Sequence, residues 1–240
     1  MNDKRPLCIV GEGLSEDCRR RLRELGFRLF IMPPYDRLGS GVRTHADLML
    51  LPLGDRFFIY SELACQYPEL IAEIEELGFE TAEQSGHPSE HYPDDIALNC
   101  LAVGRYIFCR KDCVSRQVLE YAERCGYTAV NTRQGYARCT ACPVSDRGII
   151  TADPSIRTAA LSVGLDVLEI TVGSVLLPCY DYGFIGGACG VYRDKLYFAG
   201  DLSKHPDGER IEKFCRSLGV EAVSLSDEPL TDVGSMFFVE

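Results

Sequence analysis

The chain has 240 residues, of which 46% are hydrophobic and 25% are charged, and these proportions are typical of a globular protein. Its formal net charge of −11 argues against nucleic-acid or anionic-membrane partners, which would need a basic face. No apolar run reaches the roughly 18 residues of a membrane span, and residues 1–7 lack the apolar core of a signal peptide, so we expect a cytoplasmic protein with no membrane partner.

An amphipathic helix that ends at a glycine recurs five times along the chain. In the last copy, Ile211, Phe214 and Leu218 share one helical face, and Gly219 stands where a left-handed turn would end the helix. The five stops are Gly26, Gly78, Gly126, Gly164 and Gly219, separated by 52, 48, 38 and 55 residues. A repeat of this period predicts a stacked or circular architecture.

Pairs of short apolar runs precede four of these helices, and each pair is joined by a polar or glycine-containing turn, which predicts a β-hairpin. The runs are 47–51 with 57–60, 97–102 with 106–109, 141–144 with 149–151, and 187–192 with 196–198. The first helix follows a single predicted strand at 7–11. Its missing partner is the apolar run at 233–239, so we expect the ends of the chain to pair and to close a ring without exposed sheet edges.

Each unit therefore consists of strand, strand, helix and strand, and we predict one domain made of five such units. The approximate repeats are 1–44 (completed by 227–240), 45–92, 93–137, 138–183 and 184–226. This pattern predicts an α/β fold, a closed ring of five ββαβ repeats.

Cysteine residues supply two candidate sites. The chain has twelve of them, and without a signal peptide we expect reduced thiols. Cys139 and Cys142 form a CxxC motif, a spacing that zinc sites and redox-active thiols both use, but with no second CxxC a zinc site would need other ligands brought close by folding. Cys189 lies between glycines at the start of a hairpin. It is either a nucleophile activated by backbone amides or a small residue that fits a crowded centre.

Other polar residues lie at or near predicted strand ends around the centre. His45 and Asp47 form an HxD pair at the start of the second unit, and on a strand both side chains would share one face. A group of acids at the centre would suit a cationic ligand, whose carboxylate could pair with Arg138. The candidate ligand-binding residues are Asn99, Arg138, Asp146, Asp181, Asp201, His205 and Asp232. Each of them alone also fits a solvent-exposed or helix-capping role.

Five such units closed by a C-terminal strand resemble the pentein fold of the guanidino-group-modifying enzyme superfamily, and the glycine-rich segments 133–138 and 182–187 look like those of that group. The resemblance implies a five-bladed pseudo-symmetric α/β propeller. The chain looks similar to an uncharacterised bacterial branch of that superfamily. The resemblance implies a cysteine thiolate that attacks the guanidinium carbon, a histidine that moves protons, and acids that grip the cation. The family's nucleophile lies on the closing strand, and the matching stretch here, 231–238, holds neither cysteine nor histidine.

We therefore expect a protein that binds a small cationic, guanidino or amino-acid-like ligand in the central channel, without the usual Cys-His catalysis and without a cofactor. One alternative is a thiol-dependent guanidino-modifying hydrolase or transferase with Cys189 as a relocated nucleophile. In this alternative His45 and Asp47 are catalytic, because an HxD serves this purpose in the pentein enzymes, although in a different unit. The other alternative is a zinc or redox site at Cys139 and Cys142. The ligand's identity and the oligomeric state stay open.

Overall fold

The computed structural model describes residues 5–240. Residues 1–4 lie outside the described residues. They begin the first predicted repeat, and they belong to the N-terminal stretch that was expected not to be a signal peptide. The described chain forms five three-stranded sheets. Their strands are β15 (Met236–Val239), β1 (Leu7–Gly11) and β2 (Arg28–Met32); β3 (Leu50–Leu53), β4 (Arg56–Tyr60) and β5 (Glu80–Gln84); β6 (Leu101–Val103), β7 (Tyr106–Cys109) and β8 (Thr128–Asn131); β9 (Ala141–Ser145), β10 (Gly148–Thr151) and β11 (Asp166–Glu169); β12 (Cys189–Tyr192), β13 (Lys195–Phe198) and β14 (Glu221–Ser224).

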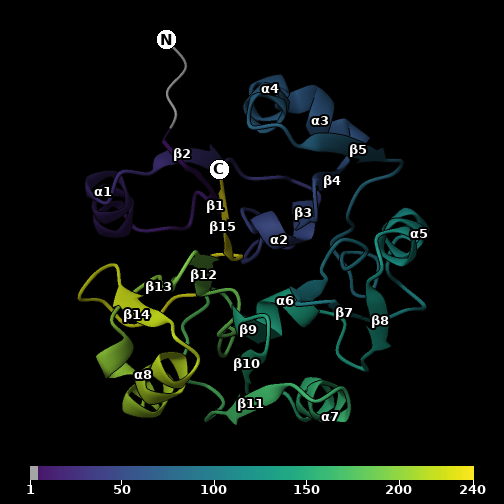
Figure 1. The fold of residues 1–240 in the computed structure, drawn as a ribbon. Coiled ribbons are helices and arrows are strands. Elements are labelled where there is room, and N and C mark those ends of the chain that lie inside the picture. The colour runs from purple at the N-terminus through teal and green to yellow at the C-terminus, as the bar shows by residue number, and fades with distance from the viewer. Residues whose placement is uncertain (1–4) are drawn as a thin grey trace.

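All five sheets have the same topology. The central strand pairs antiparallel with one neighbour and parallel with the other. Helices connect the two parallel strands, because such strands need a long crossover. The connecting helices are α1 (Glu16–Glu24), α3 (Ser61–Gln66) with α4 (Pro68–Glu76), α5 (Arg116–Arg124), α7 (Pro154–Ser162), and α8 (Gly208–Ser217) after the short 3-10 helix η1 (Leu202–Lys204). Figure 1 shows these helices on the outside and β3, β9, β12 and β15 toward the middle.

The five glycine stops are confirmed as left-handed helix ends. Their φ angles are all positive, from 78° at Gly219 to 95° at Gly26. In each copy the N–H after the glycine bonds to the carbonyl five residues earlier, as in Phe27 N–H to Leu22 O at 3.1 Å and Val220 N–H to Cys215 O at 2.9 Å. This bond satisfies a carbonyl that the helix end would otherwise leave unpaired. The five helices differ in composition, but each ends with a positive φ at its glycine and the same hydrogen bond before a strand.

The predicted pairing of the chain ends is confirmed within one sheet. β1 and β15 are antiparallel, with Leu7 opposite Val239 and Val10 opposite Met236. β15 begins later than predicted because Gly234 and the residue after it both have positive φ, which no extended strand accommodates. The five sheets remain separate, and none of them is closed among the described residues. The repeat boundaries and the single domain stay predictions.

Three predicted strands begin too early in the sequence. Residues 46–49 form a short helix, α2 (Ala46–Met49), and β6 and β12 start at Leu101 and Cys189. The chain turns at α2 because Leu48 N–H bonds to His45 O at 3.2 Å before the backbone becomes extended. A second short helix, α6 (Ala137–Thr140), stands in the same position before β9. These two short helices reach toward the middle of the molecule (Figure 1).

Buried apolar side chains from sheets and helices form the core. The largest cluster surrounds β3 and β4 and includes Phe57, Phe58 and Leu70. Among residues 5–240, no helix combines the length and the apolar character that a membrane crossing requires.

Candidate functional site

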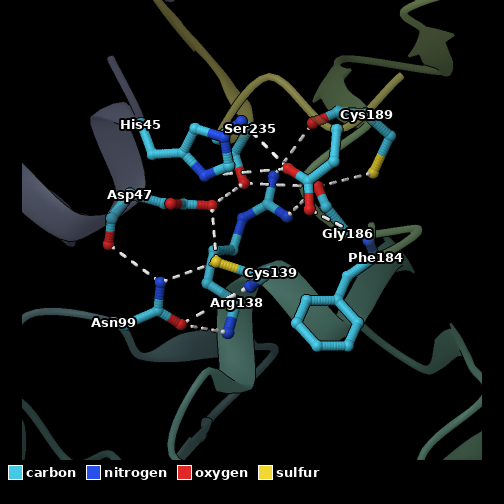
Figure 2. A network of polar contacts seen from close by, with 11 residues as sticks. His45, Asp47, Asn99, Arg138, Cys139, Phe184, Gly186, Cys189 and Ser235 are labelled. Atoms are coloured by element: carbon cyan, nitrogen blue, oxygen red, sulfur yellow. Dashed lines mark hydrogen bonds and ion pairs between the residues drawn. The ribbon is translucent and has the colours of Figure 1, made fainter. Parts of the chain in front are cut away.

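Four segments that lie outside the strands meet in one network of polar contacts (Figure 2). They are α2 with the residue before it, α6, residues 184–187 before β12, and residues 232–235 before β15. Backbone hydrogen bonds join these segments, including Asp47 N–H to Gly234 O at 3.1 Å and Gly187 N–H to Cys139 O at 2.8 Å. Side chains distant in sequence are therefore fixed against one another by the backbone itself.

The Cys139 thiol lies against the carboxylate of Asp47. Its Sγ donates to Oδ2 of Asp47 at 3.1 Å and accepts from Nδ2 of Asn99 at 3.0 Å. A ring nitrogen of His45, a carboxylate oxygen of Asp47 and Sγ of Cys139 all lie within 4.8 Å of one another, and all three residues are buried. The HxD pair thus meets a cysteine, but that cysteine is not the predicted nucleophile Cys189.

Asn99 fixes α2 relative to α6. Its Nδ2 also donates to the backbone oxygen of Asp47 at 3.0 Å, and its Oδ1 accepts the N–H of Arg138 at 2.9 Å. The side chain is buried, and these bonds use both of its amide atoms. Asn99 was predicted to bind a ligand, but in the structure its side chain bonds to α2 and α6 and does not line the pocket described below.

The segment before β15 supplies a hydroxyl and a second carboxylate. Ser235 has a φ of 68°, and its Oγ donates to Oδ2 of Asp47 at 2.6 Å. Asp232 accepts the backbone N–H groups of Phe184 at 2.9 Å and Gly234 at 3.1 Å, and its Oδ1 lies 3.8 Å from Nδ1 of His45. A positive φ at a non-glycine residue such as Ser235 costs roughly 1–3 kcal/mol, and such residues are typical of functional sites.

A pocket of about 310 Å³ opens beside this group. Its lining comprises four acids (Glu90, Asp95, Asp181 and Asp232), four aromatic residues (Tyr136, Tyr180, Tyr182 and Phe184), the aliphatic Val42, Leu48 and Leu177, and His45 with Cys139. The pocket is therefore acidic and aromatic, and its lining includes no lysine or arginine among the described residues.

Asp95 and Asp232 are the buried acids of the pocket, whereas Glu90 and Asp181 are exposed. Asp95 is 3% exposed, its Oδ2 accepts the Tyr136 hydroxyl at 2.6 Å, and its Oδ1 has no partner among the described residues. Burial raises the pKa of this carboxyl, while the bond from Tyr136 lowers it. An unpaired buried carboxylate oxygen that borders a pocket is a ready acceptor for a ligand donor.

Burial also dominates the pKa shifts around Cys139. It raises the pKa of the Cys139 thiol well above its ordinary value, and the adjacent Asp47 raises it further. It lowers the pKa of His45 and raises that of Asp47. It raises the pKa of Asp232 to about 6, against the two backbone N–H bonds that lower it. At neutral pH the thiol and the imidazole are therefore neutral when the pocket holds no cation.

Three residues singled out in the sequence do not line the pocket: Arg138, Cys142 and Cys189. The Arg138 guanidinium donates to the backbone oxygens of Gly186 at 2.8 Å and Cys189 at 3.2 Å, so it is not presented to a ligand carboxylate. Cys189 is 0% exposed, its Sγ donates to Gly186 O at 3.3 Å, and it packs in an apolar cluster with Cys142. Cys189 is thus a buried residue of this cluster, and both of its interpretations stay predictions.

The CxxC motif does not assemble into a pair of converging thiols. Cys139 is part of α6 and faces Asp47, whereas Cys142 is part of β9 and donates to Pro143 O at 3.5 Å. The chain changes from helix to strand between the two, so their side chains reach different surroundings. A joint metal site of Cys139 and Cys142 does not fit this arrangement.

The other predicted ligand residues are dispersed. Asp181 lies on the exposed rim of the pocket. Asp146 is exposed in the turn between β9 and β10, and Asp201 caps η1 through the Ser203 N–H at 2.9 Å. His205 is buried, and its Nδ1 accepts the N–H of the residue two positions later at 3.0 Å. Of the seven predicted ligand residues, only Asp181 and Asp232 line the pocket.

Sequence reasoning missed Asp95, Tyr136, Phe184 and Ser235 as site residues. Ser235 carried a usable signal, since it directly follows Gly234 at the start of the closing strand. A larger cavity of about 490 Å³ lies between α1 and residues 224–228, but its charged side chains are exposed and several pair with each other, as Arg20 does with Asp17 at 2.7 Å. None of the described residues that line it has a buried polar side-chain atom without a hydrogen-bond partner.

The comparisons with known proteins agree with this fold. The sequence matches a family of unknown function (DUF6873) over residues 9–237. Similar solved structures include a DDAH from Pseudomonas aeruginosa in complex with citrulline (11% identity, 92% of each chain, TM-score 0.52). They also include an amidinotransferase of saxitoxin biosynthesis from Microseira wollei (13% identity, 93% of this chain and 89% of that chain, TM-score 0.55) and an agmatine deiminase from C. jejuni (10% identity, 93% and 88%, TM-score 0.54). No curated protein matches the sequence. The predicted resemblance to the pentein superfamily is confirmed, and at these identities it is a likeness of fold.

Proposed function

This chain belongs to the family of unknown function DUF6873, and we propose that it binds a small organic cation, of the guanidino or amino class, in the acidic pocket beside Cys139. The observation that carries the proposal is the charge of the lining, with four carboxyl groups and no lysine or arginine among the described residues. We further infer that the five sheets act as the blades of an α/β propeller around this pocket and that the protein works in the cytoplasm of a bacterium.

The charge of the pocket favours a cation because its four carboxyl groups share the described lining with no lysine or arginine. Asp95 keeps one oxygen unpaired, and burial disfavours its ionised form. A bound cation would offset this cost and donate to the unpaired oxygen. Hydrogen bonds between charged groups are about twice as strong as neutral ones in such surroundings.

The aromatic lining supports a flat, delocalised cation. Tyr136 and Phe184 have ring centroids 6.5 Å apart with planes tilted by 32°, and Tyr182 stands edge-on to Phe184 at 6.2 Å. Aromatic faces attract cations, and guanidinium groups stack on them readily. The similar structures point to the same chemical class, since their names include an agmatine deiminase and an amidinotransferase.

The pocket favours a ligand without a carboxylate. Arg138 is engaged with backbone carbonyls, so a ligand carboxylate would meet acids and no lysine or arginine in the described lining. We therefore expect agmatine, which has a guanidinium and an amine, to bind more tightly than arginine.

Calorimetric titration with agmatine, arginine and citrulline tests the proposal. Citrulline has the shape of arginine but a neutral ureido group, so it isolates the contribution of the guanidinium charge. The expected order of affinity is agmatine, then arginine, then citrulline. Equal binding of arginine and citrulline would contradict a cation site, as would the absence of heat with all three at millimolar concentration.

A second candidate function is thiol-dependent modification of that cation. It is favoured by the position of Cys139, which lines the pocket and has the His45 ring within 4.8 Å. In such a reaction the sulfur would bond to the guanidinium carbon, a nitrogen would leave as ammonia or an amine with an added proton, and water would then release the product and restore the thiol. A bound guanidinium would favour the thiolate, whose formation burial opposes in the empty site. Release of ammonia from agmatine, lost in Cys139→Ser and kept in Cys189→Ser, would support this function.

A further inference from the structure

His45, Asp47 and Cys139 offer an imidazole nitrogen, a carboxylate oxygen and a thiol sulfur from the two short helices that precede β3 and β9. We propose that these three side chains form a zinc-binding site whose fourth coordination position faces the pocket. This site goes beyond the cation pocket and is an alternative to thiol-dependent catalysis, because the three side chains would bind the metal and the acids around Asp95 would bind the organic ligand.

The donor set and its spacing fit zinc. Zinc is bound in proteins by histidine nitrogen, carboxylate oxygen and cysteine sulfur, at about 2.0 Å to nitrogen or oxygen and about 2.3 Å to sulfur. A tetrahedral arrangement with these lengths places two ligand atoms about 3.5 Å apart. The three donor atoms here lie within 4.8 Å of one another, and Sγ of Cys139 is 3.1 Å from Oδ2 of Asp47. Small side-chain rotations would therefore create the required geometry.

The hydrogen bonding of these residues leaves metal-binding atoms free. Asp47 is 1% exposed, and its Oδ1 has no hydrogen-bond partner among the described residues. Such an orphaned buried oxygen needs an explanation, and a bound cation is one. The ring of His45, which is also buried, makes no hydrogen bond within residues 5–240, and its nearest acid is Asp232 at 3.8 Å.

Two neighbouring side chains hold the donors in place. Ser235 Oγ bonds to Oδ2 of Asp47 at 2.6 Å, and Asn99 Nδ2 bonds to Sγ of Cys139 at 3.0 Å. Metal ligands in proteins are oriented by hydrogen bonds of this kind. Both bonds can persist with a metal present, because a carboxylate and a thiolate each accept more than one contact.

Zinc binding keeps the pocket acidic. The thiol proton would pass to solvent, and the thiolate with the Asp47 carboxylate would balance the two charges of the ion. Glu90, Asp95 and Asp181 would remain uncompensated, so an organic cation could still bind beside the metal. A site with three protein ligands and one open position is the arrangement found in catalytic zinc centres.

The test uses the full chain, stripped of metal with EDTA and dialysed, and then titrated with zinc chloride and separately with cobalt chloride. We expect one ion per chain and, with Co²⁺, the visible bands of tetrahedral cobalt together with a near-ultraviolet sulfur-to-cobalt band. Cys139→Ser should remove the sulfur band, and the matched control Cys142→Ser, from the same CxxC, should keep it. Loss of the band in Cys142→Ser alone, or its persistence in Cys139→Ser, would overturn the proposal.

Two further variants keep the test decisive if Cys139→Ser does not fold. His45→Asn should abolish stoichiometric zinc binding, and unchanged zinc affinity in that variant would refute the site. Ser235→Ala should weaken zinc binding by about 10-fold, because it removes an orienting hydrogen bond. Circular dichroism checks that each variant is folded. Titration of the metal-free protein with agmatine separates this proposal from the cation pocket, since agmatine should bind with or without zinc.

Discussion

The substitution Asp95→Asn tests the acidic pocket most directly. Asparagine keeps the size of the side chain and an oxygen that can accept the Tyr136 hydroxyl, now at 2.6 Å, but it removes the charge. A hydrogen bond between charged groups contributes about 1.5–3 kcal/mol, which corresponds to a weakening of agmatine binding by roughly 10- to 100-fold. Calorimetry on the wild type and the variant measures this difference. The control is Asp146→Asn, an exposed acid outside the pocket, which should leave the affinity unchanged.

The same variant has a second, independent effect on the pH dependence of stability. Burial raises the pKa of Asp95 in the folded protein, so the folded state holds this proton more tightly than the unfolded state. The stability that Asp95 contributes is therefore greatest below its unfolded pKa of about 3.9, and it declines as the pH rises through the folded pKa. Urea unfolding at pH 4 and pH 7 should show Asp95→Asn gaining stability relative to the wild type at the higher pH.

Two results would refute this reasoning. If Asp95→Asn bound agmatine as tightly as the wild type, Asp95 would not contact the cation. If the stability difference between variant and wild type were the same at both pH values, the carboxyl would not be buried in the way the structure indicates.

Further predictions concern the backbone and the thiols. Gly187→Ala would place a Cβ on the carboxylate of Asp232. In Gly219→Ala the new Cβ meets no atom within 4 Å, and only the positive φ costs about 1–2 kcal/mol. Urea unfolding should therefore show a clearly larger loss of stability for Gly187→Ala, and an equal loss would contradict the packing. A cationic haloacetamidine should alkylate Cys139 and spare Cys189, because both are buried but only Cys139 lines the pocket. Peptide mass spectrometry would detect the labelled residue, and preferential labelling of Cys189 would contradict this placement.

The fold was predictable where its signals are local. The glycine stops are set by six consecutive residues, so five copies such as the one at Gly219 were visible in the sequence. The strand at 47–51 was placed too early because Asp47 is held by Gly234, from the far end of the chain. Apolar periodicity carries no information on such a contact.

The site was harder to predict because its partners are brought together by tertiary structure. The CxxC spacing suggested that Cys139 and Cys142 act jointly, but a change from helix to strand between them sends the two thiols apart. Cys189 was a candidate nucleophile because its glycine neighbours could present backbone amides to it, whereas in the structure those glycines allow the chain to pack closely around it. The HxD was noticed for its residue types, and only folding reveals that Cys139 is its neighbour.

The hydrogen bond from Ser235 to Asp47 joins residues 188 positions apart, and this separation has a consequence for folding kinetics. Contacts so distant in sequence form late, because the chain between them must first lose much of its conformational freedom. The pocket should therefore be among the last features to appear during refolding, after the helix ends and the individual sheets. A ligand that binds only the completed pocket would stabilise all five sheets together through mass action, and it would slow unfolding without speeding the early steps of folding.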